Sequence, residues 1–176
     1  TSFLLGRPDL GVSAANVPSF PSGHVTLAAA AMTAVVLLTG PRHRPLVATL
    51  GGVFAAAAGV ATFILGWHRP ADVLGAYLVA GCWGLVGGWL ILKREPEWNT
   101  WDDGERPPSA LWLALPWIPA VVGIGTALVI WYFILRGNET DPALSAWFLV
   151  GGSAMIVGSA MAVFGFASAL LTHQTQ

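Results

Sequence analysis

Five long apolar runs, separated by short polar segments, dominate the sequence. Each run is almost free of charged residues and approaches or exceeds the roughly 17–25 residues with which an α-helix crosses a bilayer. The pattern predicts an all-α fold, a polytopic bundle of about five transmembrane helices. The predicted helices cover residues 22–39, 46–66, 70–92, 110–135 and 143–171.

Glycine and proline mark several of the predicted boundaries. Gly40-Pro41 ends the first helix, because proline cannot continue a helix that glycine has closed. Pro70 suits the first position of the third helix, where a missing N–H costs nothing. Pro116 and Pro119 are expected to kink the fourth helix.

Composition supports a membrane protein. Of the 176 residues, 55% are hydrophobic and 10% are charged, whereas soluble domains carry about 25% charged residues. The net charge of −1 and the lack of a basic stripe argue against nucleic-acid binding. The single Cys82 excludes an internal disulfide. Because the chain starts at Thr1 and not at Met, we expect further N-terminal sequence, including additional helices.

The basic residues predict how the helices are oriented. Loops on the cytoplasmic side of a membrane protein are enriched in Lys and Arg, and alternate loops carry five and three basic residues. The richer side is therefore expected to be cytoplasmic, in a plasma (inner) membrane, and His24 and His68 then share the extracytoplasmic face. The two sets are Arg42, Arg44, Lys93, Arg94 and Arg106 against Arg7, Arg69 and Arg136.

The start of the first helix carries the sequence Pro21-Ser22-Gly23-His24. Backbone N–H groups without intrahelical partners, a hydroxyl and an imidazole gather there, and the helix dipole favours an anion at the same place. A phosphate is the expected ligand.

A second histidine lies at the start of the third helix, on the same predicted face. His68 and Asp72 are spaced i, i+4, so the carboxylate can hold the imidazole by one nitrogen and leave the other basic. Such an imidazole suits a nucleophile, and His24 from the other helix can protonate a leaving alkoxide. Arg7 and Arg69 add positive charge for phosphoryl oxygens.

Three motifs in this order resemble the signature of the type 2 phosphatidic acid phosphatase superfamily, which includes membrane lipid phosphate phosphatases and soluble vanadium haloperoxidases. They are Arg7-Pro8, Pro21-Ser22-Gly23-His24 and His68-x-x-x-Asp72, and the resemblance covers about residues 7–90. It implies that His68 attacks phosphorus and forms a phosphohistidine, with Asp72 orienting it. His24 would be the general acid, and Ser22 with the Gly23 N–H would bind phosphoryl oxygens. No metal or other cofactor is implied.

The chain departs from the family pattern in two places. In the first motif, the Lys with which the family pattern opens would precede Thr1. The Arg of that motif is present as Arg7, which the resemblance implies is a further oxyanion ligand. The Ser-Arg pair of the third motif is replaced by Ala61 and Thr62, which removes one positive charge from the phosphate site. Arg69 is the natural replacement, although it fits equally well an interfacial arginine that extends to lipid headgroups.

These patterns predict a membrane phosphatase that hydrolyses a lipid phosphate or pyrophosphate, polyprenyl or glycerolipid. The alternative is a non-catalytic family member that acts as a membrane or lipid-binding subunit of a larger complex. A vanadate-dependent oxidase is a more distant alternative, because that branch is soluble. Helices near Gly84, Gly88 or 143–171 could contact a partner or a second copy. The expected organisation is a phosphatase-like core over 1–92, a polar cytoplasmic loop over 93–109 and two additional transmembrane helices over 110–176.

Overall fold

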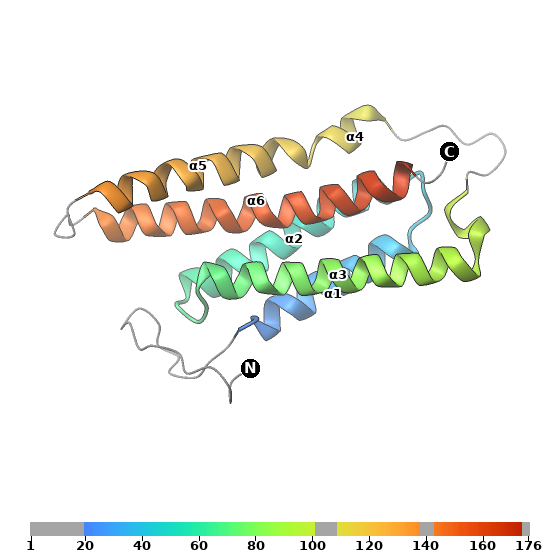
Figure 1. Ribbon diagram of the computed structural model, residues 1–176, viewed down its shortest axis with the longest axis horizontal. Coiled ribbons are helices and arrows are strands. Elements are labelled where there is room, and N and C mark those ends of the chain that lie inside the picture. Colours follow the sequence, from blue (N-terminus) through green and yellow to red (C-terminus); the bar gives the residue numbers. More distant parts are fainter. Residues whose placement is uncertain (1–19, 101–108, 138–142, 174–176) are drawn as a thin grey trace.

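The computed structural model describes residues 20–100, 109–137 and 143–173. The described part is helical and contains no strand, which confirms the predicted all-α class. The long helices run lengthwise beside one another in an elongated bundle (Figure 1). The elements are α1 (Gly23–Leu38), α2 (Arg44–Ile64), α3 (Pro70–Arg94), the short 3₁₀ helix η1 (Pro96–Asn99), α4 (Ala110–Ala114), α5 (Trp117–Arg136) and α6 (Leu144–His173).

Four of the five predicted helical segments are long and apolar enough to cross a membrane. They are α2, α3, the combined α4–α5 segment and α6. The remaining helix, α1, has 16 residues, slightly fewer than the roughly 17–25 that span the hydrocarbon core. It is shorter than predicted because Ser22 is its N-cap and Thr39 already has an extended backbone. These lengths fit an integral membrane protein.

Local sequence explains most of the observed helix ends. The Ser22 hydroxyl accepts a hydrogen bond from the Val25 N–H and so caps α1. Gly66, with a φ of 71°, turns the chain after α2, a backbone conformation that favours glycine. The predicted kink occurs at Pro116, which separates α4 from α5. Pro119 lies within the first turn of α5, where it does not interrupt the helix.

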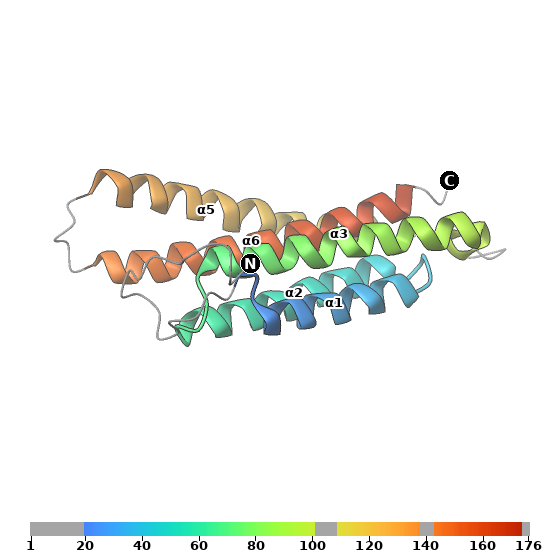
Figure 2. The ribbon, with the colours of Figure 1, turned by 60° about the horizontal axis from the view of Figure 1, so that its bottom comes forward.

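The long helices pack against one another in pairs along the bundle. α2 packs against α1 and α6, α3 packs against α1 and α6, and α5 lies along α6 (Figures 1 and 2). Small residues allow these close approaches. A Cβ on Gly123 of α5 would lie 3.0 Å from the Gly158 Cα of α6. One on Gly59 would collide with the Tyr77 hydroxyl, which donates to the Ala55 carbonyl.

The two glycines considered as a partner surface, Gly84 and Gly88, lie against α1. A Cβ on Gly84 would lie 2.5 Å from Thr33 Cγ2 of α1, and one on Gly88 would lie 3.5 Å from Leu37 Cδ2. The small residues of α3 therefore let α1 and α3 approach each other, as small residues do in membrane helices.

The predicted loop at residues 41–45 differs from the structure. α2 begins at Arg44 and accepts Pro45 in its first turn. The Arg44 side chain is 1% exposed, and its guanidinium lies 4.6 Å from the centre of the Trp98 ring. Nε donates to the Thr39 carbonyl, and Nη1 donates to Asn99 Oδ1. A charge that the sequence assigns to an exposed cytoplasmic loop is thus buried.

The η1 segment extends these contacts to the ends of two further helices. Trp98 Nε1 donates to the Leu37 carbonyl at 3.1 Å, and Asn99 Nδ2 donates to the Leu171 carbonyl at 2.8 Å. Asn99 is 2% exposed. The carbonyls at a helix C-terminus lack intrahelical partners, so η1 supplies them with donors. We call Arg44, Trp98 and Asn99, with the groups they bond, the Arg44 cluster.

Candidate active site

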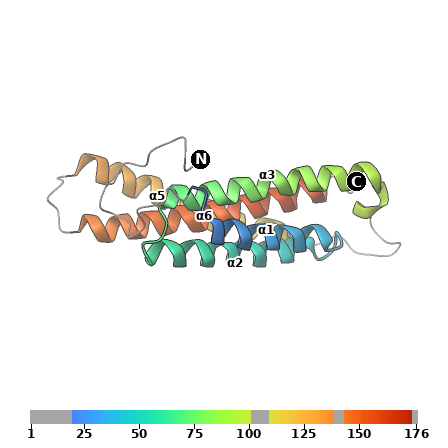
Figure 3. The same cartoon turned by 90° about the horizontal axis from the view of Figure 1, so that it is seen from below.

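The start of α1 lies against the start of α3, at the end of the bundle away from the Arg44 cluster (Figures 1 and 3). The Ser22 N–H donates to the Asp72 carbonyl at 3.0 Å. Ser22 is fully buried, and Asp72 is also buried. Two segments that are distant in the sequence are thereby held together by a backbone bond, and we call the residues around it (Ser22, Gly23, His24, His68, Arg69 and Asp72) the site end.

Asp72 fixes the first turn of α3 and faces His68. Its Oδ2 accepts a hydrogen bond from the Arg69 N–H at 3.1 Å, which satisfies one free donor of the helix start. The same oxygen lies 3.6 Å from His68 Nδ1, and both side chains are mostly buried. This separation suits an ion pair once the imidazole is protonated. The i, i+4 spacing therefore brings the two groups together across one turn of the chain.

The backbone of His68 is held by the end of α2. The N–H groups of Trp67 and His68 both donate to the Thr62 carbonyl, at 3.1 and 3.3 Å. Thr62 is buried, and its hydroxyl donates to the Gly59 carbonyl. Thr62 thus holds the backbone of His68 through its carbonyl, while its side chain bonds within its own helix.

His24 is exposed at the first turn of α1. Its ring lies 6.0 Å from the Trp67 ring, centre to centre, at an angle of 47°. Beside it, a Cβ on Gly23 would meet no atom of the described residues within 4 Å. The first N–H groups of a helix have no intrahelical acceptor. Among the described residues, nothing covers Gly23 and His24, so this surface suits an anion that approaches the helix start.

Arg69 brings a positive charge to the same end. It is the N-cap residue of α3, with an extended backbone, and its side chain is partly buried. Its Nε is buried and has no hydrogen-bond partner among the residues that the structure describes. A buried donor without a partner is costly, so this nitrogen is suited to an added acceptor. Arg7, the other arginine predicted for the site, lies outside the described residues.

Sequence reasoning missed two aromatic residues at the site end. Trp67 contacts His24, as described above, and Phe20 lies against Gly75 of α3. A Cβ on Gly75 would lie 2.5 Å from Phe20 Cε2 and Cζ. The only signals for these contacts in the sequence are an aromatic beside each motif and a glycine one turn after Asp72.

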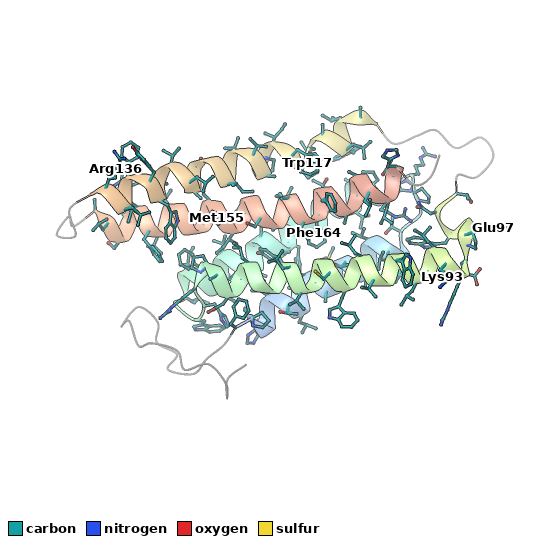
Figure 4. All side chains as sticks on the ribbon, viewed as in Figure 1. Lys93, Glu97, Trp117, Arg136, Met155 and Phe164 are labelled. Carbon is teal, nitrogen blue, oxygen red and sulfur yellow. The ribbon has the colours of Figure 1, made fainter. Side chains whose placement is uncertain are left out.

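Charged side chains lie at both ends of the bundle. Figure 4 shows Arg136 at the end where α3 begins and Lys93 with Glu97 at the other end. Lys93 and Arg94 close α3. In the structure, α1 and α3 start at one end of the bundle and α2 starts at the other (Figures 1 and 3). The predicted orientation assumes this topology.

Comparison with known proteins identifies the family. No curated protein and no solved structure matches the chain significantly. The family model described as the PAP2 superfamily matches residues 4–96, which is more than half of the chain and includes all of the site end. The chain therefore belongs to the PAP2 superfamily.

Proposed function

We propose that this protein is a membrane phosphatase that hydrolyses a lipid phosphate or pyrophosphate, polyprenyl or glycerolipid, through a phosphohistidine intermediate. Membership of the PAP2 superfamily supports a phosphatase-type function in general, and the four long apolar helices support a membrane location. The observation that carries the proposal is the pairing of His68 with Asp72 at 3.6 Å beside the start of α1.

In the first half of the reaction, His68 is the nucleophile. With Nδ1 protonated and facing Asp72, the Nε2 lone pair attacks phosphorus, and the bond from phosphorus to the lipid oxygen breaks. Protonated His24 gives its proton to that leaving oxygen. The carboxylate of Asp72 stabilises the positive charge that develops on the imidazole.

In the second half, water attacks the phosphohistidine. Neutral His24 takes a proton from the water as the oxygen bonds to phosphorus. The N–P bond then breaks, which returns His68 to its starting state and releases inorganic phosphate. One histidine thus serves as acid and then as base.

The negative charge on the phosphoryl oxygens requires donors in both halves. The Gly23 N–H at the start of α1, the Ser22 hydroxyl and the Arg69 side chain are the described groups suited to this task. A hydroxyl that accepts one hydrogen bond can still donate its own proton. The unpartnered Nε supports Arg69 as the replacement for the charge missing at Thr62, and Arg7 is proposed as a further ligand.

The site is proposed to face the extracytoplasmic side of a plasma (inner) membrane, following the distribution of basic residues. In that position the headgroup reaches the polar end of the bundle while the lipid chain stays in the bilayer.

Phosphate release from lipid substrates tests the proposal. The purified full chain in detergent micelles is expected to release phosphate from polyprenyl or glycerolipid phosphates, with inhibition by vanadate, and His68→Ala should reduce release to background. His43→Ala, at an exposed histidine near the start of α2, is the matched control. Equal release from the wild type and His68→Ala would refute the mechanism.

A second candidate is a lipid-binding subunit without turnover. The observation that favours it is Thr62, whose buried side chain bonds within α2 where the family pattern has an Arg. This candidate predicts that wild type and His68→Ala bind a lipid phosphate alike, and that neither releases phosphate.

A further inference from the structure

A cavity of about 320 Å³ lies between α1, α3 and α6, in the half of the bundle away from the site end. Its wall is apolar and includes Gly81, Gly84 and Gly88 of α3. Leu85 and Trp89 also line it and are 42% and 58% exposed, so it opens onto the lipid-facing surface. A hydrocarbon chain is the ligand that such a wall accepts within a bilayer.

The cavity and the site end both lie where α1 packs against α3, but they are far apart along these helices. At 1.5 Å per residue, Thr33 is about 16 Å beyond Ser22 along α1, and Gly81 is about 14 Å beyond Asp72 along α3. Half of the hydrocarbon core is roughly 15 Å thick. A chain whose phosphate is held at the site end must therefore cross a whole leaflet before it reaches the cavity.

The part of the α1–α3 contact between the site end and the cavity is filled by the protein itself. Val25, Ala29 and Ala76 have no exposed surface there. A bound chain would follow the outer surface of the helices over this distance and become enclosed only beside the glycines of α3. The protein therefore encloses only the distal part of the lipid's hydrocarbon chain.

We propose that this cavity holds the distal part of the substrate's hydrocarbon chain and selects a polyprenyl phosphate or pyrophosphate whose chain is longer than one leaflet. The proposal rests on the proposed function and narrows its substrate class. An acyl chain that spans a single leaflet ends at the near edge of the cavity, beside Thr33, and does not extend into it, whereas a longer polyprenyl chain fills it.

Two substitutions fill the cavity from opposite walls. Gly88→Leu adds bulk from α3, where a Cβ would make ordinary contacts with Leu37 at 3.5 Å and Leu171 at 3.9 Å. Ala167→Leu adds bulk from α6. Gly125→Leu is the matched control, because a Cβ on this glycine of α5 meets no atom within 4 Å in the part of the chain that the structure describes.

Kinetics with two pyrophosphates of different chain length test the selection. Gly88→Leu and Ala167→Leu are each expected to raise KM for a long-chain polyprenyl pyrophosphate about tenfold, as loss of about two buried methylenes would. Neither should change kcat, or any constant for farnesyl pyrophosphate. Gly125→Leu should match the wild type. Equal KM values for the two substrates, unchanged in the variants, would overturn the proposal while leaving the phosphatase function intact.

Cross-linking tests the cavity without turnover. A long-chain polyprenyl phosphate with a photoreactive group on its terminal isoprene unit is expected to label residues 81–92 or 163–171. Labelling should fall at least severalfold in Gly88→Leu and Ala167→Leu and persist in His68→Ala. Labelling without phosphate release would support the cavity as the binding site of the hydrocarbon chain and would refute the proposed phosphatase function. Equal labelling of these residues by a phosphatidylcholine with a terminal photoreactive group would assign the cavity to bilayer lipid and overturn the proposal.

Discussion

The two ends of the bundle use similar residues in opposite ways. At each end an arginine lies at the start of a helix, and a tryptophan belongs to the same end. Arg44 is 1% exposed, donates to Thr39 and Asn99, and covers the Trp98 ring. Arg69 is less buried, and its Nε has no partner among the described residues.

The difference lies in what the remaining polar groups bond. In the Arg44 cluster, Trp98 and Asn99 of η1 donate to carbonyls at the ends of α1 and α6. Asn99 also accepts from Arg44 of α2, so η1 connects three helices. One nitrogen of Arg44, Nη2, also lacks a partner in the described residues. The side chain around it is almost fully buried, however. At the site end His24 is exposed at an open helix start. Polar groups bonded to one another hold the fold, whereas those left open can bind a ligand.

The largest effect that separates the two ends is expected from Asp72→Asn. The amide oxygen can still accept from the Arg69 N–H, so the cap of α3 survives, but the charge that orients and stabilises the His68 imidazole is lost. We expect kcat to fall by about 10²–10⁴ with less than about 1 kcal/mol change in the free energy of unfolding. Phosphate release and thermal unfolding of the same sample measure both. An unchanged kcat would remove Asp72 from the mechanism.

Arg44→Ala should have the opposite profile. It leaves Asn99 Oδ1 and the Trp98 ring without their partner, and a buried acceptor left unsatisfied costs about 1–3 kcal/mol. Chemical unfolding in detergent should show this loss, while kcat per folded molecule stays within about twofold. Arg42→Ala, at an exposed arginine two positions earlier, is the control and should leave stability unchanged. A large fall in kcat without a loss of stability would contradict a purely structural role.

Arg69→Ala is expected to lower kcat/KM by about 10²-fold, which is typical of a lost electrostatic donor. Stability should change little, because the Arg69 backbone N–H that donates to Asp72 Oδ2 remains. Arg69→Lys should recover part of the rate, since it restores charge without the fork of donors. Arg136→Ala, at an exposed arginine of the same end, is the control. If both alanine variants behave like the wild type, Arg69 is an interfacial arginine and the missing charge is supplied elsewhere.

The sequence predicts what depends on neighbours along the chain. The four long helices follow from run length alone, and the His68–Asp72 pairing follows from a one-turn spacing. The predicted start of α2 was wrong because a charged residue such as Arg44 is typical of a loop. Its burial depends on Asn99, 55 positions later. No local pattern encodes such a contact.

The same limit applies within the site end. The sequence predicts an anion site at the start of α1, but it does not predict the bond from the Ser22 N–H to the Asp72 carbonyl. Nor does it predict that Trp67 faces His24 or that Phe20 covers Gly75. Each of these contacts joins residues on different helices or turns, so it appears only once the bundle is assembled.

The smallest expected effect tests whether such a contact positions the catalytic groups. A Cβ on Gly75 would lie 2.5 Å from the Phe20 ring, so Gly75→Ala should push the ring outward and shift Ser22 and His24, which follow it in the chain. We expect kcat to fall about threefold to tenfold, with KM nearly unchanged. Phe20→Ala in the same chain removes the clash, so the double variant should lose less activity than the two single losses combined. Gly125→Ala is the control on an open helix surface. Additive losses in the double variant would mean that Phe20 does not transmit the effect, and that the bond between Ser22 and Asp72 alone positions the start of α1.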